Sequence, residues 1–189
     1  MLKPSPVAVT LSFLCALGVL CGESSCGESS GLQPGQRPGP YTFVLSTGPQ
    51  RGKLHCYICE TADRPAVVIF ARSLTDPLGK LVGKLDKAVA EHQKAELRAW
   101  VTFLSDDQPT LDPKIVEWGQ KHALRSVPLG VFEDAAGPPS YRLSRSADVA
   151  VLFFVKQKVV ANYTFKTGEL NEDKIGEVMK SLPRIVEKK

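Results

Sequence analysis

The sequence predicts an α/β domain in which a mixed central sheet is flanked by helices. Two observations lead to this prediction. In the middle of the chain, β-prone runs alternate with amphipathic helical segments, and strands joined through helices run parallel. Near the C-terminus, a short turn at 156–158 separates two β-prone runs, which must therefore pair antiparallel. The sheet is expected to contain both kinds of pairing.

The strands are recognised by their alternation or by their β-branched composition. Residues 41–45 alternate apolar and polar side chains and predict a short first strand at an edge of the sheet. Residues 65–71 are almost continuously apolar, which is typical of a strand buried on both faces. Four further runs predict strands: 97–104, 127–132, 149–155 and 159–165.

The helices are recognised by their caps and their apolar spacing. Asp76 followed by Pro77 predicts an N-cap and the first helical position. The apolar stripe of that helix comprises Leu78, Leu81, Val82, Leu85, Ala88 and Val89. Asp112-Pro113 repeats the start signal for a second helix, and Asn171 predicts the cap of a terminal helix that ends at Pro183.

The first forty residues predict export rather than folded structure. Residues 1–22 contain an early Lys3, an apolar stretch and then small residues, the pattern of a secretory signal peptide. The alternative is a lipoprotein signal acylated on Cys21, although Leu20 is bulky for such a site. Residues 23–40 predict a low-complexity linker without fixed structure, because they have almost nothing to bury. We therefore expect a domain over 41–189 that is periplasmic or extracellular, with a membrane anchor only if it is lipidated.

Composition and charge narrow the function classes. The net charge of +4 comes from 24 basic and 20 acidic residues that are scattered along the chain, so nucleic acid is not an expected partner. The sequence contains no glycine-rich phosphate loop, nucleophile elbow or zinc-protease helix, and we expect no cofactor.

The order of these elements resembles the thioredoxin/redoxin superfamily over about residues 41–185. The resemblance rests on the run 65–72 leading into a helix, the hairpin 151–159 and the capped terminal helix. It implies a thioredoxin-like fold, but the usual thioredoxin chemistry is not carried over, because the features that support it are missing. Exchange with protein thiols or disulfides would have to depend on another cysteine pair. That superfamily places a Cys-x-x-Cys pair where the helix after the first core strand begins, because a helix N-terminus lowers a thiol pKa. Here that position, 72–77, contains no cysteine, and Asp148 aligns with the superfamily's cis-proline.

The chain carries a different cysteine pair, Cys56 and Cys59, ahead of the core strand. Three interpretations stay open: a redox pair that exchanges disulfides with a partner, a structural disulfide in a redox-silent binding or scaffold module, and a metal site completed by His55. Haem attachment is excluded because Glu60 stands where a histidine is required. The leading hypothesis assigns Cys56 and Cys59 as catalytic residues, with Cys56 attacking because it lies beside His55.

Overall fold

A computed structural model describes residues 30–187 of the chain. The predicted signal peptide, and the linker up to residue 29, lie outside the described residues. Within them, no helix is both long enough and apolar enough to span a bilayer.

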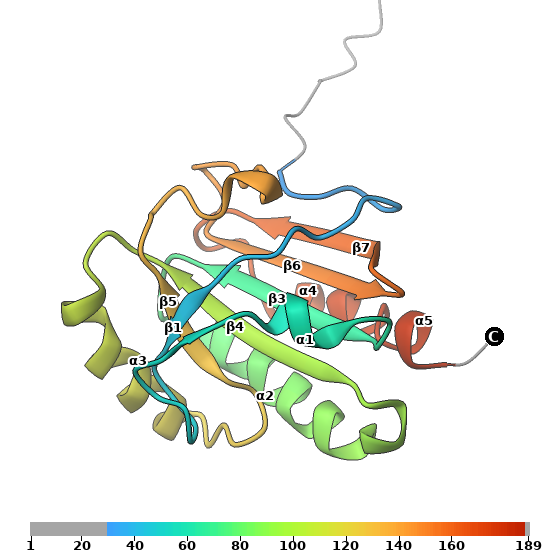
Figure 1. Ribbon diagram of the computed structural model, residues 1–189, viewed down its shortest axis with the longest axis horizontal. Coiled ribbons are helices and arrows are strands. Elements are labelled where there is room, and N and C mark those ends of the chain that lie inside the picture. Colours follow the sequence, from blue (N-terminus) through green and yellow to red (C-terminus); the bar gives the residue numbers. More distant parts are fainter. Residues whose placement is uncertain (1–29, 188–189) are drawn as a thin grey trace, which may run out of the picture.

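A seven-stranded mixed sheet forms the centre of the molecule (Figure 1). Its spatial order is β2-β1-β5-β4-β3-β6-β7. The strands are β1 (Phe43–Leu45), β2 (Leu54–His55), β3 (Ala66–Ala71), β4 (Arg98–Leu104), β5 (Leu129–Phe132), β6 (Val149–Val155) and β7 (Lys158–Phe165). β3, β4 and β5 pair in parallel, whereas the β3–β6, β6–β7, β1–β5 and β1–β2 pairs are antiparallel. The predicted mixed sheet is confirmed.

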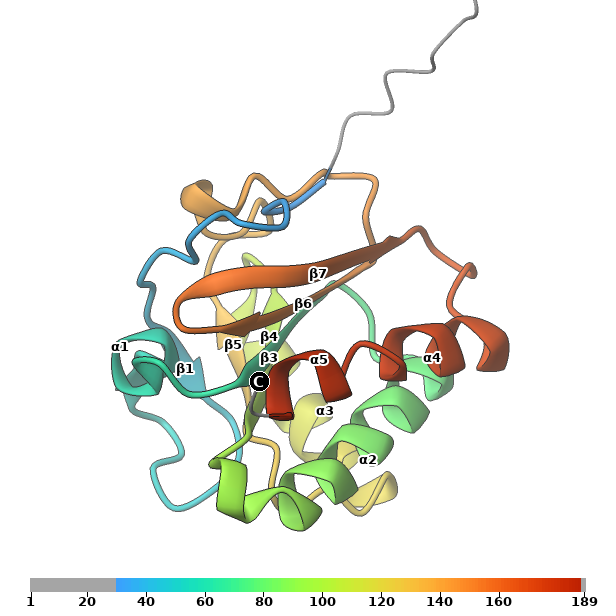
Figure 2. The ribbon, with the colours of Figure 1, turned by 90° about the vertical axis from the view of Figure 1, so that its right-hand side faces the viewer.

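Helices cover both faces of the sheet unequally. One face carries α2 (Asp76–Glu91), α3 (Gln108–Lys121), α4 (Glu172–Met179) and α5 (Pro183–Val186). The opposite face carries only the short α1 (Tyr57–Thr61) and the chain segments around it. Figure 2 shows α1 on one side of the sheet and α2, α4 and α5 on the other. Two short 3₁₀ turns, at Gln93–Ala95 and Pro139–Tyr141, complete the elements.

The alternation of strand side chains divides the core into two layers. In β3, all six residues are buried, as predicted. Val67 and Ile69 face the four helices together with the α2 stripe, while Val68 and Phe70 face α1. The layer below α1 is aromatic: Tyr41, Phe43, Trp100, Tyr141 and Phe154 meet there. The short helix α1 therefore packs on a layer of buried aromatic side chains.

Two helices begin earlier than their aspartate-proline pairs predict. Thr75, rather than Asp76, caps α2, and its Oγ1 accepts a hydrogen bond from the Leu78 N–H at 3.4 Å. Asp107 caps α3 through the Thr110 N–H, which leaves Pro113 inside the helix. In both cases a side-chain acceptor upstream caps the helix, so that α2 begins one residue earlier, at Asp76, and α3 five residues earlier, at Gln108.

The first strand is not at the edge of the sheet. β2, which the sequence did not predict, pairs outside β1 with Phe43 opposite His55. It is only two residues long, too short to leave a periodic signal.

Residues 30–40 differ from the linker expected there, because this part of the segment has a partner to pack against. Leu32 is only 3% exposed and belongs to the aromatic layer. The backbone of Gly35 and Gln36 exchanges hydrogen bonds with Val159 at 2.8 and 2.9 Å, which covers part of the outer edge of β7. Residues 30–40 therefore belong to the folded domain.

Candidate functional site

The cysteine pair lies at the start of α1, where β2 leads directly into the helix. Cys56 and Cys59 form a disulfide with their Cα atoms 5.4 Å apart. Cys56 is the N-cap residue of α1, and its Sγ accepts a hydrogen bond from the Cys59 N–H at 3.2 Å. Cys59 is exposed and Cys56 is half-buried. Cys59 is thus the more exposed residue of the pair, while the Cys56 sulfur accepts a hydrogen bond from a backbone donor.

The side of α1 that faces the sheet anchors the helix on the aromatic layer. The Tyr57 ring stacks on Trp100 with centroids 5.3 Å apart and lies 5.9 Å from Phe43. Ile58 packs against the same layer. Burial is the main cause that raises the pKa of the Tyr57 phenol, with the charge of Glu60 adding to it. α1 is therefore fixed by packing as well as by its disulfide.

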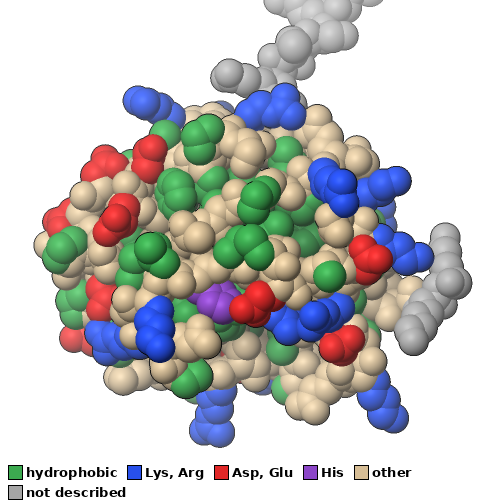
Figure 3. Space-filling model, viewed as in Figure 1, with side chains coloured by type: hydrophobic (Ala, Val, Ile, Leu, Met, Phe, Trp, Pro, Cys, Tyr) green, Lys and Arg blue, Asp and Glu red, His purple; other side chains and the backbone are tan. Residues whose placement is uncertain are grey.

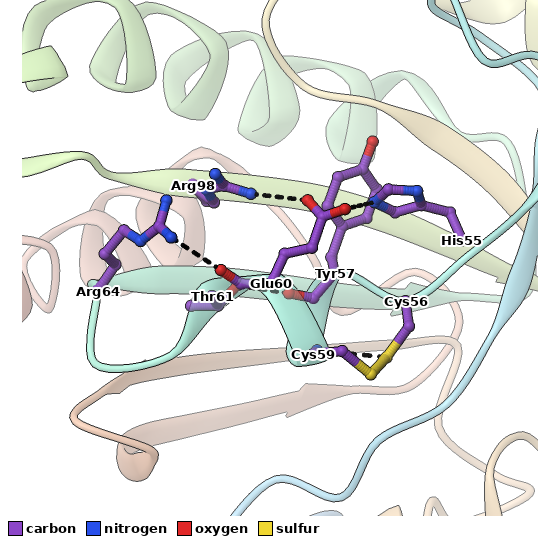
Figure 4. Close-up of polar contacts among 8 residues, drawn as sticks. All are labelled: His55, Cys56, Tyr57, Cys59, Glu60, Thr61, Arg64 and Arg98. Atoms are coloured by element: carbon purple, nitrogen blue, oxygen red, sulfur yellow. Dashed lines mark hydrogen bonds and ion pairs between the residues drawn. A yellow bond between two sulfur atoms is a disulfide. The ribbon is translucent and has the colours of Figure 1, made fainter.

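A small charged cluster joins α1 to β2 and β4 (Figure 4). The Glu60 carboxylate lies 3.2 Å from His55 Nε2 and 3.1 Å from Arg98 Nη1, and Arg64 donates to the Glu60 carbonyl at 3.0 Å. The His55 ring and the Glu60 carboxylate approach each other without the geometry of a hydrogen bond. In Figure 4, the imidazole and the carboxylate point toward each other and away from the sulfurs. His55, which the sequence placed as a helper of Cys56, is thus directed to Glu60 instead.

The surface beside α1 combines charge with apolar area. Figure 3 shows a histidine flanked by acidic and basic side chains, with hydrophobic side chains gathered on the same face. Leu54, two residues before Cys56, is 68% exposed and is the one large hydrophobic residue within 30–187 with this degree of exposure. Single exposed apolar residues are ordinary on protein surfaces, so Leu54 by itself does not mark a contact surface.

The position that thioredoxin-like enzymes use is occupied by other chemistry. Ser73 Oγ lies 2.8 and 2.7 Å from the two carboxylate oxygens of Asp148. The Arg72 guanidinium donates to the backbone carbonyls of Ala135, Ser144 and Ala147, so it ties the loop between β5 and β6 to the end of β3. Desolvation is the main cause that lowers the pKa of this guanidinium. A serine–aspartate pair and an arginine therefore stand where a cysteine pair is usual.

The metal interpretation finds no ligand cluster in the part of the chain that the structure describes. No group of three or more histidine, cysteine, aspartate or glutamate side chains is arranged there to hold an ion. With the disulfide closed, Cys56 and Cys59 offer no thiolate, which is the form of cysteine that ligates zinc.

Sequence reasoning missed α1 and the cluster that holds it. A helix of five residues contains too few positions to show a 3.6-residue period. The Glu60–Arg98 pair joins residues 38 positions apart, so no local spacing announces it. The one available signal was Cys56 itself. Its sulfur accepts a hydrogen bond from the N–H of Cys59, three residues later, as the side chain of an N-cap residue does.

No family model matches this chain, and no curated protein matches it in sequence. Its structure does match solved structures. One is a proposed protein disulfide isomerase from Bacteroides thetaiotaomicron, with a TM-score of 0.63, 16% identity, and coverage of 85% of this chain and 95% of that chain. A second is a proposed thiol:disulfide interchange protein, DsbE, from Chlorobium tepidum, with a TM-score of 0.64, 9% identity, and coverage of 82% and 99%.

A third match is a secreted disulfide oxidoreductase of Mycobacterium tuberculosis that is homologous to DsbE of E. coli. Its TM-score is 0.54 at 12% identity, and the match covers 75% of this chain and 96% of that one. At these identities, the likeness establishes the architecture. The chain has the thioredoxin-like fold with a divergent sequence, as its element order predicted.

Proposed function

We propose that this thioredoxin-fold protein is exported and exchanges disulfides with protein thiols or disulfides through Cys56 and Cys59. The observation that carries the proposal is the contrast between the two bonded cysteines: Cys59 is an exposed residue, while Cys56 is half-buried and its Sγ accepts the Cys59 N–H at 3.2 Å. An exposed sulfur can be attacked, and a sulfur with a backbone donor is the better leaving group, because the donor stabilises its thiolate.

The exchange begins when a partner thiolate attacks Cys59 Sγ. The Cys56–Cys59 bond breaks, its electron pair leaves on Cys56 Sγ, and a partner–Cys59 mixed disulfide forms. A second partner thiolate then attacks the partner sulfur and releases the Cys59 thiolate. The partner gains one disulfide, while Cys56 and Cys59 take up two electrons and, on protonation, two protons. In the reverse direction, Cys59 attacks a partner disulfide and Cys56 resolves the intermediate.

This scheme assigns the attacking role to Cys59, whereas the sequence favoured Cys56. The sequence argument relied on His55 lying beside Cys56 as a cation. The imidazole is directed to Glu60, so the reason for preferring Cys56 is weakened. Exposure, the other requirement for attack, favours Cys59.

Export is supported by the predicted signal peptide at 1–22, and one structural neighbour is a secreted protein. An oxidising compartment is also where a closed disulfide persists. The test is processing of the full chain in a secreting host, with the new N-terminus read by mass spectrometry. An unprocessed chain that stays in the cytosol would contradict export, but it would not test disulfide exchange through Cys56 and Cys59.

The reduction potential of the pair tests the chemistry directly. After equilibration in redox buffers and alkylation, mass spectrometry of the Cys56–Cys59 peptide gives the oxidised fraction. We expect a potential between about −270 and −120 mV, the range of thiol–disulfide oxidoreductases. A value below about −300 mV would indicate a permanent structural bond instead.

Turnover on a protein disulfide such as insulin supplies the second readout. Replacing both Cys56 and Cys59 by serine should abolish it. The matched control is Ser73→Ala, which changes the usual redox position of the fold and should leave turnover intact. The proposal is contradicted if Ser73→Ala abolishes turnover and the double serine variant does not, because the reaction would then depend on the usual redox position of the fold and not on Cys56 and Cys59.

The alternative is a redox-silent binding or scaffold module in which the disulfide staples α1. The specific observation in its favour is the Ser73–Asp148 pair at the usual redox position. This alternative predicts no turnover for the natural chain. It also predicts that the double serine variant has a free energy of unfolding at most about 2 kcal/mol lower than the natural chain. This is the value expected from the chain entropy when a disulfide closes a four-residue loop.

A further inference from the structure

The side chain of Glu60 links the two residues that flank the cysteine pair. His55, at the end of β2, directly precedes Cys56. Glu60, in α1, directly follows Cys59. One oxygen of the Glu60 carboxylate lies 3.2 Å from His55 Nε2 (Figure 4). The segment 56–59, which the disulfide closes, therefore has a second, noncovalent contact between the residues at its two ends.

The second carboxylate oxygen of Glu60 joins this contact to the centre of the sheet. It accepts a hydrogen bond from Arg98 Nη1 at 3.1 Å. Arg98 is the first residue of β4, a strand that is paired on both sides, with β3 and with β5. Through one side chain, Glu60 thus contacts both the edge strand β2 and the central strand β4. A single exposed ion pair adds little to the stability of a whole protein, but this one encloses the cysteine pair.

The contacts of Glu60 do not involve either sulfur. In Figure 4, the carboxylate points toward His55 and Arg98 and away from the disulfide. The backbone carbonyl of Glu60 is held separately, because it accepts a hydrogen bond from Arg64 at 3.0 Å. These contacts can therefore persist when the disulfide is reduced.

We propose that Glu60 is a positioning residue that sets the redox equilibrium of Cys56 and Cys59. In the reduced chain, its contacts keep the two ends of 56–59 together, so that the two thiols stay close. Proximity raises their effective concentration and favours the disulfide. The coupling is reciprocal, because contacts that a closed disulfide strengthens also strengthen the disulfide. The inference rests on the proposed exchange reaction, in which this equilibrium sets the direction of electron flow.

Equilibration of the full chain with glutathione tests this role. Two glutathione thiols form one glutathione disulfide, and their two electrons and two protons convert the Sγ–Sγ bond into two thiols. Alkylation and mass spectrometry of the Cys56–Cys59 peptide give the reduced fraction. Dithiothreitol replaces glutathione if the natural pair is too stable for it to reduce.

Glu60→Ala removes both carboxylate contacts and keeps a good helix former at this position. Without these contacts, the reduced segment gains freedom and its thiols separate more often. The equilibrium should therefore shift about fivefold toward the dithiol, the equivalent of about 20 mV for a two-electron couple. The matched control is Glu177→Ala, which removes an exposed carboxylate that pairs with Lys174 at 2.9 Å on α4. It should leave the equilibrium unchanged.

Arg98→Met separates positioning from a direct effect of charge. Loss of the Arg98 hydrogen bond should also shift the equilibrium toward the dithiol, by about threefold or about 14 mV. A purely electrostatic influence predicts opposite signs for the two variants. Removing the negative charge of Glu60 would favour the thiolates of the reduced pair, whereas removing the positive charge of Arg98 would disfavour them.

The proposal is wrong if Glu60→Ala shifts the equilibrium by less than about twofold, or about 9 mV. It is equally wrong if Glu60→Ala and Arg98→Met shift it in opposite directions, or if Glu177→Ala shifts it as far as Glu60→Ala. Insulin turnover by the natural chain tests the exchange reaction separately. Absent turnover with the expected shifts contradicts exchange and supports the role of Glu60, whereas turnover without the shifts contradicts only the role of Glu60.

Discussion

At the scale of single residues, Cys56 and Cys59 share one bond but have different surroundings. Cys56 is half-buried between β2 and α1 and accepts a backbone N–H, while Cys59 is exposed on the first turn of the helix. Glu60 follows Cys59 directly, yet its charge is directed to His55 and Arg98. A residue next to a cysteine in the sequence, such as Glu60, therefore need not direct its charge toward that cysteine's sulfur.

Single-cysteine variants separate the two thiols. With Cys15, Cys21 and Cys26 replaced by serine, Cys56→Ser leaves only Cys59, and Cys59→Ser leaves only Cys56. At pH 9, where an ordinary thiol is largely ionised, access governs the reaction with an aromatic disulfide reagent. We expect Cys59 to react at least about fivefold faster than Cys56, because it is the more exposed residue. Equal rates, or a faster Cys56, would return the attacking role to Cys56.

At the scale of elements, α1 cannot be stable by itself. Five residues form barely one turn, and isolated helices of that length do not persist in water. The helix is held by the Tyr57–Trp100 stack, the Glu60–Arg98 ion pair and the disulfide at its start. Its end is strained, since Ala62 adopts φ 48° and ψ −123°, a conformation that suits glycine.

Relief of that strain gives a test of how α1 ends. Ala62 is exposed, so Ala62→Gly removes no buried contact, and it should raise the free energy of unfolding by about 1 kcal/mol. Urea unfolding of both chains measures the difference. The control is Ala95→Gly, in the 3₁₀ turn after α2, where the alanine is not strained and glycine should destabilise by about 0.5–1 kcal/mol. A destabilised Ala62→Gly variant would show that the backbone there is not left-handed.

At the scale of the whole molecule, the layer below α1 is an aromatic core with internal hydrogen bonds. Tyr41 Oη lies 2.7 Å from Thr102 Oγ1 and accepts the Trp100 Nε1–H at 2.9 Å, and the Tyr141 hydroxyl donates to the Gly39 carbonyl at 2.9 Å. Burial raises the pKa of both Tyr41 and Tyr141 far above that of a free phenol. These contacts join the N-terminal segment, β4 and the β5–β6 loop into one unit.

The raised tyrosine pKa values predict a loss of stability in alkali. A tyrosine whose pKa is higher in the folded chain than in the unfolded chain contributes its full stabilisation below the unfolded pKa, near pH 10. This stabilisation is lost as the pH rises from the unfolded pKa toward the folded pKa. Each of the two tyrosines should lower the free energy of unfolding by about 1.4 kcal/mol per pH unit above pH 10.

Urea unfolding at pH 9, 10 and 11 measures this dependence. Tyr141→Phe removes one titrating phenol. Above pH 10, the free energy of unfolding of this variant should therefore fall less steeply with pH than that of the natural chain, by about 1.4 kcal/mol per pH unit. The same slope in the variant and the natural chain would contradict burial of Tyr141 as its cause.

The sequence by itself determined the features that arise within one stretch of chain. The continuous apolar run of β3 predicts a strand buried on both faces, the spacing from Leu78 to Ala88 predicts the buried stripe of α2, and Asn171 caps α4. The turn at Lys156–Gln157 fixes the antiparallel β6–β7 pair. Each of these depends on hydrogen bonds or burial whose pattern repeats along the chain, so that their order was enough to predict the thioredoxin-like fold.

Only the tertiary structure decided the surroundings of the site. It placed Leu32 in the aromatic layer, brought Glu60 to both His55 and Arg98, and brought Ser73 to Asp148, residues 75 positions apart in the chain. It also made β2 the edge strand and buried Ser46 completely. Charges and hydrogen bonds act through space over a few ångströms, and the folded sheet, rather than the spacing of residues along the chain, sets those distances.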